Sequence, residues 1–161
     1  MAILLTDATL ATMTDGYGLI ADAAVAMDDD LILWAGPMAD LPEVYASLRS
    51  HSAQGRLVTP ALIDCHSHIV FGGDRAAEFE MRLNGASYEE VARAGGGILS
   101  TVKATRAASE ADLLASALAR ADQIIAGGAA TIEVKSGYGL TIADELKMLR
   151  VARRIGKLRP V

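Results

Sequence analysis

Two histidines, His66 and His68, stand one residue apart in the run Asp64-Cys65-His66-Ser67-His68. In a β-strand, residues i and i+2 point to the same face, so both imidazoles and the Asp64 carboxylate would project together. Imidazoles are common ligands of zinc and iron, and two on one face can chelate one ion. Because a catalytic zinc usually has three protein ligands plus water, the pair is not a complete site. The spacing therefore predicts either part of a metal site or two histidines hydrogen-bonded within a core.

Two further polar residues follow apparent strands. Arg75 ends the stretch Phe71-Gly72-Gly73-Asp74-Arg75, and Tyr138 lies between two glycines. Residues beyond the carboxyl ends of parallel strands lie at the edge where such sheets bind ligands. An arginine there can hold a carboxylate with two parallel hydrogen bonds, and a tyrosine hydroxyl can face a ligand. The alternatives are an ion pair of Arg75 with Asp74 or Glu78, and a loop aromatic that covers the core.

Four other reactive residues are explained more simply as parts of the structure. Cys65 has no evident histidine partner, and we expect a small buried strand residue. Glu133 and Lys135 share one strand face, where we expect an internal ion pair rather than a carbamylated lysine that bridges two metals. We expect His51, in a loop-like segment, to lie at the surface.

The elements that position these residues differ between the two parts of the chain. Before residue 57, the apolar runs Ala23–Met27 and Leu31–Trp34 flank three aspartates, which favours a β-hairpin. A short helix is possible over Pro42–Arg49. This part is expected to be a small β unit without chemistry of its own.

From residue 57 the pattern is that of an α/β protein. The nearly continuous apolar run from Leu57 to Phe71 predicts a strand buried on both faces. Capping residues Ser87, Ser109 and Thr141 predict the starts of three helices, which glycines end at 95–97, 127–128 and 156. A second strand is expected over 130–135. The alternation predicts βα units on a parallel sheet.

Composition limits the classes of function. The chain has 161 residues, 52% of them hydrophobic, and a net charge of −5. An acidic chain without a basic block is a poor binder of nucleic acid. A single cysteine excludes an internal disulfide, and we expect neither a secretory signal nor a membrane span. These features favour a cytoplasmic globular protein.

The run Thr59–His68 resembles the opening barrel strand of the metal-dependent amidohydrolase superfamily. The usual form there is Pro-Gly-hydrophobic-Ile-Asp-x-His-x-His, and Ala61 stands here in place of the common glycine. Three further stretches, taken together and in order, resemble the imidazolonepropionase family more narrowly. They are Val70–Arg75, Ala94–Val102 and Glu133–Leu140.

The resemblance implies a (β/α)₈ TIM barrel preceded by part of a small β-sandwich domain. Residues 1–56 would be the N-terminal part of the β-sandwich, and residues 57–161 the first βα units of the amidohydrolase barrel. The barrel would be incomplete in this chain, because the family's later strands have no counterpart in it. We therefore expect the chain to be the N-terminal portion of a longer protein.

The resemblance also implies an activity, the hydrolysis of the cyclic amide of 4-imidazolone-5-propanoate to N-formimidoyl-L-glutamate in histidine degradation. One zinc or iron ion is implied; His66 and His68 match two of its ligands, and Arg75 and Tyr138 match residues that hold the substrate. A homodimer is implied for the full-length protein, with no nucleic-acid or membrane partner. The alternatives are a truncated, inactive metal-binding fragment and another amidohydrolase, such as a deaminase.

Overall fold

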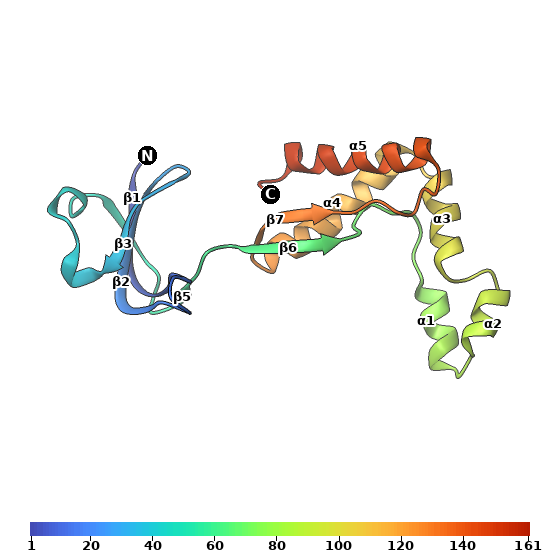
Figure 1. Ribbon diagram of the computed structural model, residues 1–161, viewed down its shortest axis with the longest axis horizontal. Coiled ribbons are helices and arrows are strands. Elements are labelled where there is room, and N and C mark those ends of the chain that lie inside the picture. Colours follow the sequence, from blue (N-terminus) through green and yellow to red (C-terminus); the bar gives the residue numbers. More distant parts are fainter. The chain divides into compact units, whose positions relative to one another are not determined.

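The computed structural model describes all 161 residues of the chain (Figure 1). It divides them into two compact units, Met1–Pro60 and Ala61–Val161. The division falls directly after Pro60, between a strand that belongs to the first unit and a strand that belongs to the second. The predicted candidate residues from His66 onward all lie in the second unit.

The first unit is a five-stranded sheet. Its central strand β1 (Ile3–Ala11) pairs antiparallel with β2 (Leu19–Asp28) and parallel with β4 (Arg49–Ser52) and β5 (Leu57–Val58). The β2 strand forms a hairpin with β3 (Leu31–Pro37), which confirms the hairpin predicted around the three aspartates.

Small apolar side chains cover both faces of this sheet. One buried cluster contains Ala8, Leu10, Ala23 and Val25, and a second contains Leu4, Ala24 and Ala26 with Trp34 packed against it. Alternate residues of β2 thus enter opposite clusters, as the two-residue period of a strand requires. The possible helix over Pro42–Arg49 is only a single turn of 3₁₀-helix, η2 (Glu43–Tyr45), after a similar turn η1 (Met38–Asp40).

The second unit contains a parallel pair of strands and five helices (Figure 1). Strands β6 (Leu62–Ser67) and β7 (Ala129–Val134) pair in parallel, with Ile63 opposite Thr131, which confirms the predicted βα pattern. The helices are α1 (Ala76–Leu83), α2 (Tyr88–Arg93), α3 (Ile98–Ala107), α4 (Glu110–Ala126) and α5 (Ile142–Leu158). None of them has both the length and the hydrophobicity that a membrane span requires.

The predicted caps start three of these helices. Ser87 and Glu90 form a reciprocal capping box at α2, and the Ser109 and Thr141 hydroxyls accept from backbone amides at α4 and α5. The predicted end of the last helix at Gly156 is wrong, because α5 continues through this glycine to Leu158.

The core of the second unit lies where α4 and α5 pack on each other and on the segment after β6. Leu113, Ala117 and Ala121 of α4 meet Met148, Val151 and Ile155 of α5, together with Ile69 and Val70. The α4 residues lie four positions apart, on one helical face as predicted. The segment that follows β6 is therefore anchored by its own apolar side chains.

One expectation for the strand after residue 57 is wrong. Leu62 and Ile63 of β6 are 59% and 65% exposed, and Cys65 is exposed rather than buried. A parallel strand is buried on both faces only when further strands and helices cover it, and β6 pairs here with β7 alone.

We expect Leu113→Ala to lower the free energy of unfolding by about 3 kcal/mol, because it removes a fully buried side chain and leaves a cavity between α4 and α5. Denaturant unfolding followed by circular dichroism measures the loss. Leu146→Ala, at a half-exposed leucine of α5, is the control and should cost less than about 1 kcal/mol. Equal losses in both variants would contradict this description of the core.

Candidate active site

The two histidines lie together at the carboxyl end of β6. His66 is in the strand and His68 directly follows it. Their ring centroids are 5.2 Å apart and the rings meet edge to face. His66 is exposed, whereas His68 is half-buried and its Nδ1 is buried without a hydrogen-bond partner. The pair therefore presents at least one ring nitrogen that nothing in the chain satisfies.

Asp64 fixes the backbone of this strand end rather than extending the pair. Its carboxylate accepts hydrogen bonds from the Ser67 hydroxyl at 2.5 Å and from the His66 amide at 3.1 Å. These bonds, first that of Ser67, lower the pKa of Asp64 below its ordinary value. A regular strand would place Ser67 and Asp64 on opposite faces, but the pairing of β6 with β7 is irregular between these two residues, and their side chains meet.

Aromatic rings connect the histidines to the loop after β7. Tyr138 lies in that loop, with its ring centroid 5.4 Å from that of His68. The ring of Phe71 meets Tyr138 edge to face at 5.9 Å. Two loops that follow the parallel strands thus meet through Phe71 and Tyr138, as expected for residues at the carboxyl ends of such strands.

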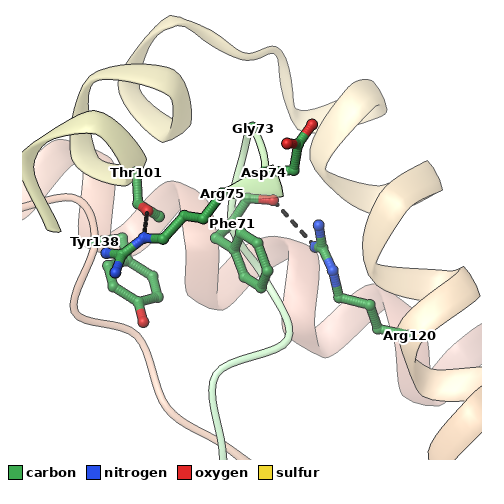
Figure 2. A pocket seen from close by; sticks show the side chains of 7 residues that line it. All are labelled: Phe71, Gly73, Asp74, Arg75, Thr101, Arg120 and Tyr138. Atoms are coloured by element: carbon green, nitrogen blue, oxygen red, sulfur yellow. Dashed lines mark hydrogen bonds between the residues drawn. The ribbon is translucent and has the colours of Figure 1, made fainter. Parts of the chain in front are cut away.

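Arg75 and Tyr138 line one cavity of about 490 Å³, shown in Figure 2. Phe71, Gly73, Asp74, Thr101 and Arg120 complete its lining. The Nε of Arg75 donates a hydrogen bond to the Thr101 hydroxyl at 3.2 Å, and the side chain remains 42% exposed. The alternative, an ion pair with Glu78, is present only at an N–O distance of 4.0 Å. The guanidinium is therefore oriented by a neutral partner and keeps donors free for an anion.

Gly72, three residues before Arg75, is needed for close packing of the loop. A Cβ on Gly72 would lie 2.8 Å from the carbonyl oxygen of Ala104 in α3, and the Gly72 amide donates to the buried Thr105 hydroxyl at 3.0 Å. Only a glycine lets the backbone approach a helix so closely. Gly72 thereby fixes the loop between Phe71 and Arg75 against α3.

The loop of Tyr138 is held by Glu145 and Arg106. The Glu145 carboxylate in α5 accepts from the amides of Gly139 at 2.8 Å and Leu140 at 2.7 Å. Arg106 Nε donates to the Gly139 carbonyl at 2.6 Å. Burial raises the pKa of Glu145, but hydrogen bonds from Leu140 and other groups of the loop outweigh it, so the pKa lies below its ordinary value.

This pKa predicts a pH dependence. Because the folded-state pKa of Glu145 is lowered, the carboxylate stabilises the fold above its unfolded-state pKa, and that stability is lost as pH falls through the folded-state pKa. We expect Glu145→Gln to lower Tm at pH 7 and to reduce the loss of Tm below about pH 5. Thermal unfolding at several pH values measures both, with Glu89→Gln at an exposed site as control. Parallel Tm profiles of Glu145→Gln and wild type would contradict the role of this carboxylate.

The remaining candidates lie apart from the cavity lining. Lys135 and Glu133 form the predicted ion pair, but their side chains are 39% and 54% exposed, so the pair is not internal. His51 lies exposed in β4, which confirms a surface position although not a loop.

The donor set of β6 fits part of a metal site. Two adjacent imidazoles, one with an unpartnered buried nitrogen, suit zinc or iron. No group of three or more histidine, cysteine, aspartate or glutamate side chains that could hold a metal is present in the structure. The chain thus offers two ligands, and a complete site needs at least one more.

Sequence reasoning did not find Phe71, Thr101 or Arg120 as lining residues. Phe71 and Thr101 each lie within stretches that carry the family resemblance, but an aromatic or a threonine there is compatible with a core role. Arg120 left a clearer signal, because it lies three residues after Ala117 and four before Ile124, both in the apolar stripe of α4. A charged residue beside such a stripe needs buried or half-buried partners.

Solved structures show the same fold at low sequence identity. Ochratoxinase from A. niger superimposes with a TM-score of 0.59 at 23% identity, over 97% of this chain and 28% of that one. Molinate hydrolase superimposes with a TM-score of 0.56 at 18% identity, over 97% of this chain and 27% of that one. No protein-family model matches the chain.

Curated relatives are far more similar in sequence. A protein from Roseobacter denitrificans is 65% identical over 161 residues, which are 99% of this chain and 41% of the relative. One from Paracoccus denitrificans is 62% identical, over 98% of this chain and 40% of the relative. Both are named imidazolonepropionase. Over its whole length, therefore, the chain is similar to imidazolonepropionases, and it spans about two fifths of the length of those it matches.

Proposed function

We propose that this chain supplies part of the active site of an imidazolonepropionase, an enzyme that hydrolyses 4-imidazolone-5-propanoate to N-formimidoyl-L-glutamate. The observation that carries the proposal is the grouping of His66, His68 and Tyr138 at the carboxyl ends of β6 and β7, with Arg75 and Tyr138 lining one cavity. This is the edge at which parallel sheets bind their substrates. The names of the relatives support the choice of reaction.

The proposal includes the larger fold. The second unit would be the first βα units of a (β/α)₈ barrel, and the first unit would be part of a small β-sandwich domain. The exposed apolar side chains of β6, Leu62 and Ile63, support this assignment, because further barrel strands would cover them. The chain would then form the N-terminal portion of a longer, homodimeric enzyme of the cytoplasm, without nucleic-acid or membrane partners.

His66 and His68 would hold one zinc or iron ion together with ligands from outside the described residues. When bound, such an ion lowers the pKa of a water molecule and polarises a carbonyl group. The edge-to-face contact of the two rings and the ring of Tyr138 beside His68 restrict the orientation of both imidazoles. Pre-set ligand orientation lowers the entropic cost of assembling the site.

Arg75 and Tyr138 would position the substrate. The Arg75 guanidinium, oriented by Thr101, would hold the propanoate carboxylate through charge-assisted hydrogen bonds. Tyr138 would face the imidazolone ring and orient it. In the hydrolysis, water adds to the ring carbonyl carbon, the ring C–N bond breaks, and the released nitrogen takes a proton. No group of this chain is assigned to that proton transfer.

One observation favours a second function. The chain holds no group of three or more side chains able to complete a metal site. A fragment with only His66 and His68 would bind a metal weakly and hydrolyse nothing. Under this alternative the same fold serves only as a metal-binding module.

A chimera separates the two functions. In this chimera, the 161 residues of the chain replace the matching two fifths of the Roseobacter denitrificans relative. Loss of 4-imidazolone-5-propanoate is followed by absorbance with zinc or iron supplied, beside the unmodified relative and the 161-residue chain alone. Aminated purines and pyrimidines are offered as competing substrates, because a deaminase would act on them.

We expect the chimera to hydrolyse the imidazolone within about tenfold of the relative's kcat/KM, since this chain supplies the residues proposed here and the relative supplies the rest of its own site. We expect no action on the aminated bases. A folded chimera without turnover, beside an active relative, would overturn the proposed function in favour of the metal-binding fragment. Action on the aminated bases would overturn it in favour of a deaminase.

A further inference from the structure

Arg120 lies on α4, at the edge of the cavity that Arg75 and Tyr138 line. It forms no ion pair with a carboxylate, and instead its Nη1 donates to the carbonyl oxygens of Ile69 at 3.0 Å and Phe71 at 3.1 Å. Burial lowers the pKa of Arg120 from its ordinary value, although an arginine remains charged in proteins. Burying half of a charged side chain costs free energy, so the position of Arg120 on two backbone carbonyls is not explained by surface charge alone.

The same guanidinium also lies over an aromatic ring. Its central carbon is 3.5 Å from the centroid of Phe71, within the range of a cation–π contact. Figure 2 shows the Phe71 ring between Arg120 and Tyr138. The hydrogen bond to its carbonyl fixes the backbone of Phe71, and the contact with its ring fixes the side chain. Arg120 therefore orients both the backbone and the side chain of Phe71.

The position of Phe71 in turn affects the proposed site, because its ring contacts Tyr138. Its ring meets Tyr138 edge to face at 5.9 Å, and Tyr138 in turn lies 5.4 Å from His68. These two ring contacts, Phe71 with Tyr138 and His68 with Tyr138, are the only contacts between aromatic rings that join the segment after β6 to the segment after β7. A shift of Phe71 would therefore move Tyr138 relative to the imidazole beside it.

We propose that Arg120 is a positioning residue, which holds Phe71 so that Tyr138 and His68 keep the geometry needed to bind substrate. The inference rests on the proposed function for its effect on catalysis, but the geometry can be tested separately. Arginine is suited to this role because its planar group can stack on a ring and donate in plane at the same time. Lysine can donate to the carbonyls but cannot stack in this way.

The first test uses the 161-residue chain itself. Tyrosine ring resonances are recorded by NMR with ¹³C-labelled tyrosine, and that of Tyr138 is assigned by its loss in Tyr138→Phe. We expect Arg120→Met to shift the Tyr138 ring resonances, because the ring currents of Phe71 and His68 change. Arg120→Lys should give a smaller shift. Arg153→Met, at an exposed arginine of α5, is the matched control and should give none.

The second test measures kinetics in the chimera. We expect Arg120→Met to raise KM for 4-imidazolone-5-propanoate about tenfold, with a smaller change in kcat, and Arg120→Lys to recover part of the loss. Unchanged Tyr138 resonances and an unchanged KM in a folded Arg120→Met protein would overturn the inference. If that variant does not fold, Arg120→Lys decides, since it keeps the charge but removes the planar group stacked on Phe71, and unchanged Tyr138 resonances in it would overturn the inference. An inactive wild-type chimera would refute the proposed function, while the NMR result would still decide the positioning role.

Discussion

Replacement of His66 by alanine in the chimera is expected to lower kcat/KM for 4-imidazolone-5-propanoate by about a thousandfold or more. His66 and His68 are the only adjacent imidazoles of the chain, with centroids 5.2 Å apart. If both imidazoles bind the metal as proposed, the loss of one would leave a single imidazole ligand from this chain, which cannot retain a metal against water at the same affinity. Turnover and bound metal should therefore fall together.

The measurement pairs kinetics with metal content by mass spectrometry of the purified protein. His51→Ala is the matched control, because the third histidine is exposed in β4 of the other unit. We expect His51→Ala to keep both metal and turnover. A His66→Ala chimera that keeps its metal and its kcat/KM would show that this histidine is not a ligand.

The second large effect is expected at Arg75. Arg75→Met in the chimera should raise KM about a hundredfold and change kcat much less, because the loss falls on binding of the substrate carboxylate. Charge-assisted hydrogen bonds contribute about 1.5–3 kcal/mol, and every 1.4 kcal/mol is about a factor of ten. Arg75→Lys should recover only part of the loss, since lysine cannot donate two parallel hydrogen bonds.

A substrate change separates lost binding from lost structure. An imidazolone with a neutral propanamide side chain should show a raised KM with the wild-type chimera and little further rise with Arg75→Met. Arg93→Met, at an arginine exposed in α2, is the control for the charge change. An equal rise of KM for both substrates in Arg75→Met would contradict a contact between Arg75 and the carboxylate.

Local signals in the sequence predict the parts of the fold that local bonds determine. Ser87, Ser109 and Thr141 start helices because each side chain accepts from an amide three residues later. Helices α1 and α3 were not predicted, and neither has a side-chain cap. At α1 the Asp74 carboxylate, one residue before the N-cap, accepts from the Ala76 amide at 3.0 Å, whereas α3 is held by its buried residues Thr101, Val102 and Thr105, and a single sequence does not display this burial.

Burial was predicted less well, because it depends on neighbours far along the chain. Leu62, Ile63 and Cys65 have the composition of a covered parallel strand, yet all three are exposed in the two-stranded sheet. The prediction holds for Ile69 and Val70, which α4 and α5 cover. One part of the same apolar run is therefore exposed and another part is buried, depending on which strands and helices cover it.

The candidate site was predictable where residue type and spacing carry the information. The two-residue spacing of His66 and His68 predicts adjacent rings, and the structure brings them together. Tyr138 beside His68 could be expected only from the topology, because the two are 70 positions apart and meet through parallel strands. The role proposed for Arg120 could be inferred only from the contacts in the structure, because its hydrogen-bond partners are backbone carbonyls, which every residue has.

The most direct test of the central claim is a crystal structure of the chimera with anomalous diffraction measured at the zinc and iron absorption edges. The proposed function predicts one strong anomalous peak within about 2.0–2.2 Å of a ring nitrogen of both His66 and His68. With N-formimidoyl-L-glutamate bound, the side-chain carboxylate of the product should contact Arg75. A metal bound elsewhere, or a product carboxylate away from Arg75, would contradict the assignment of this site.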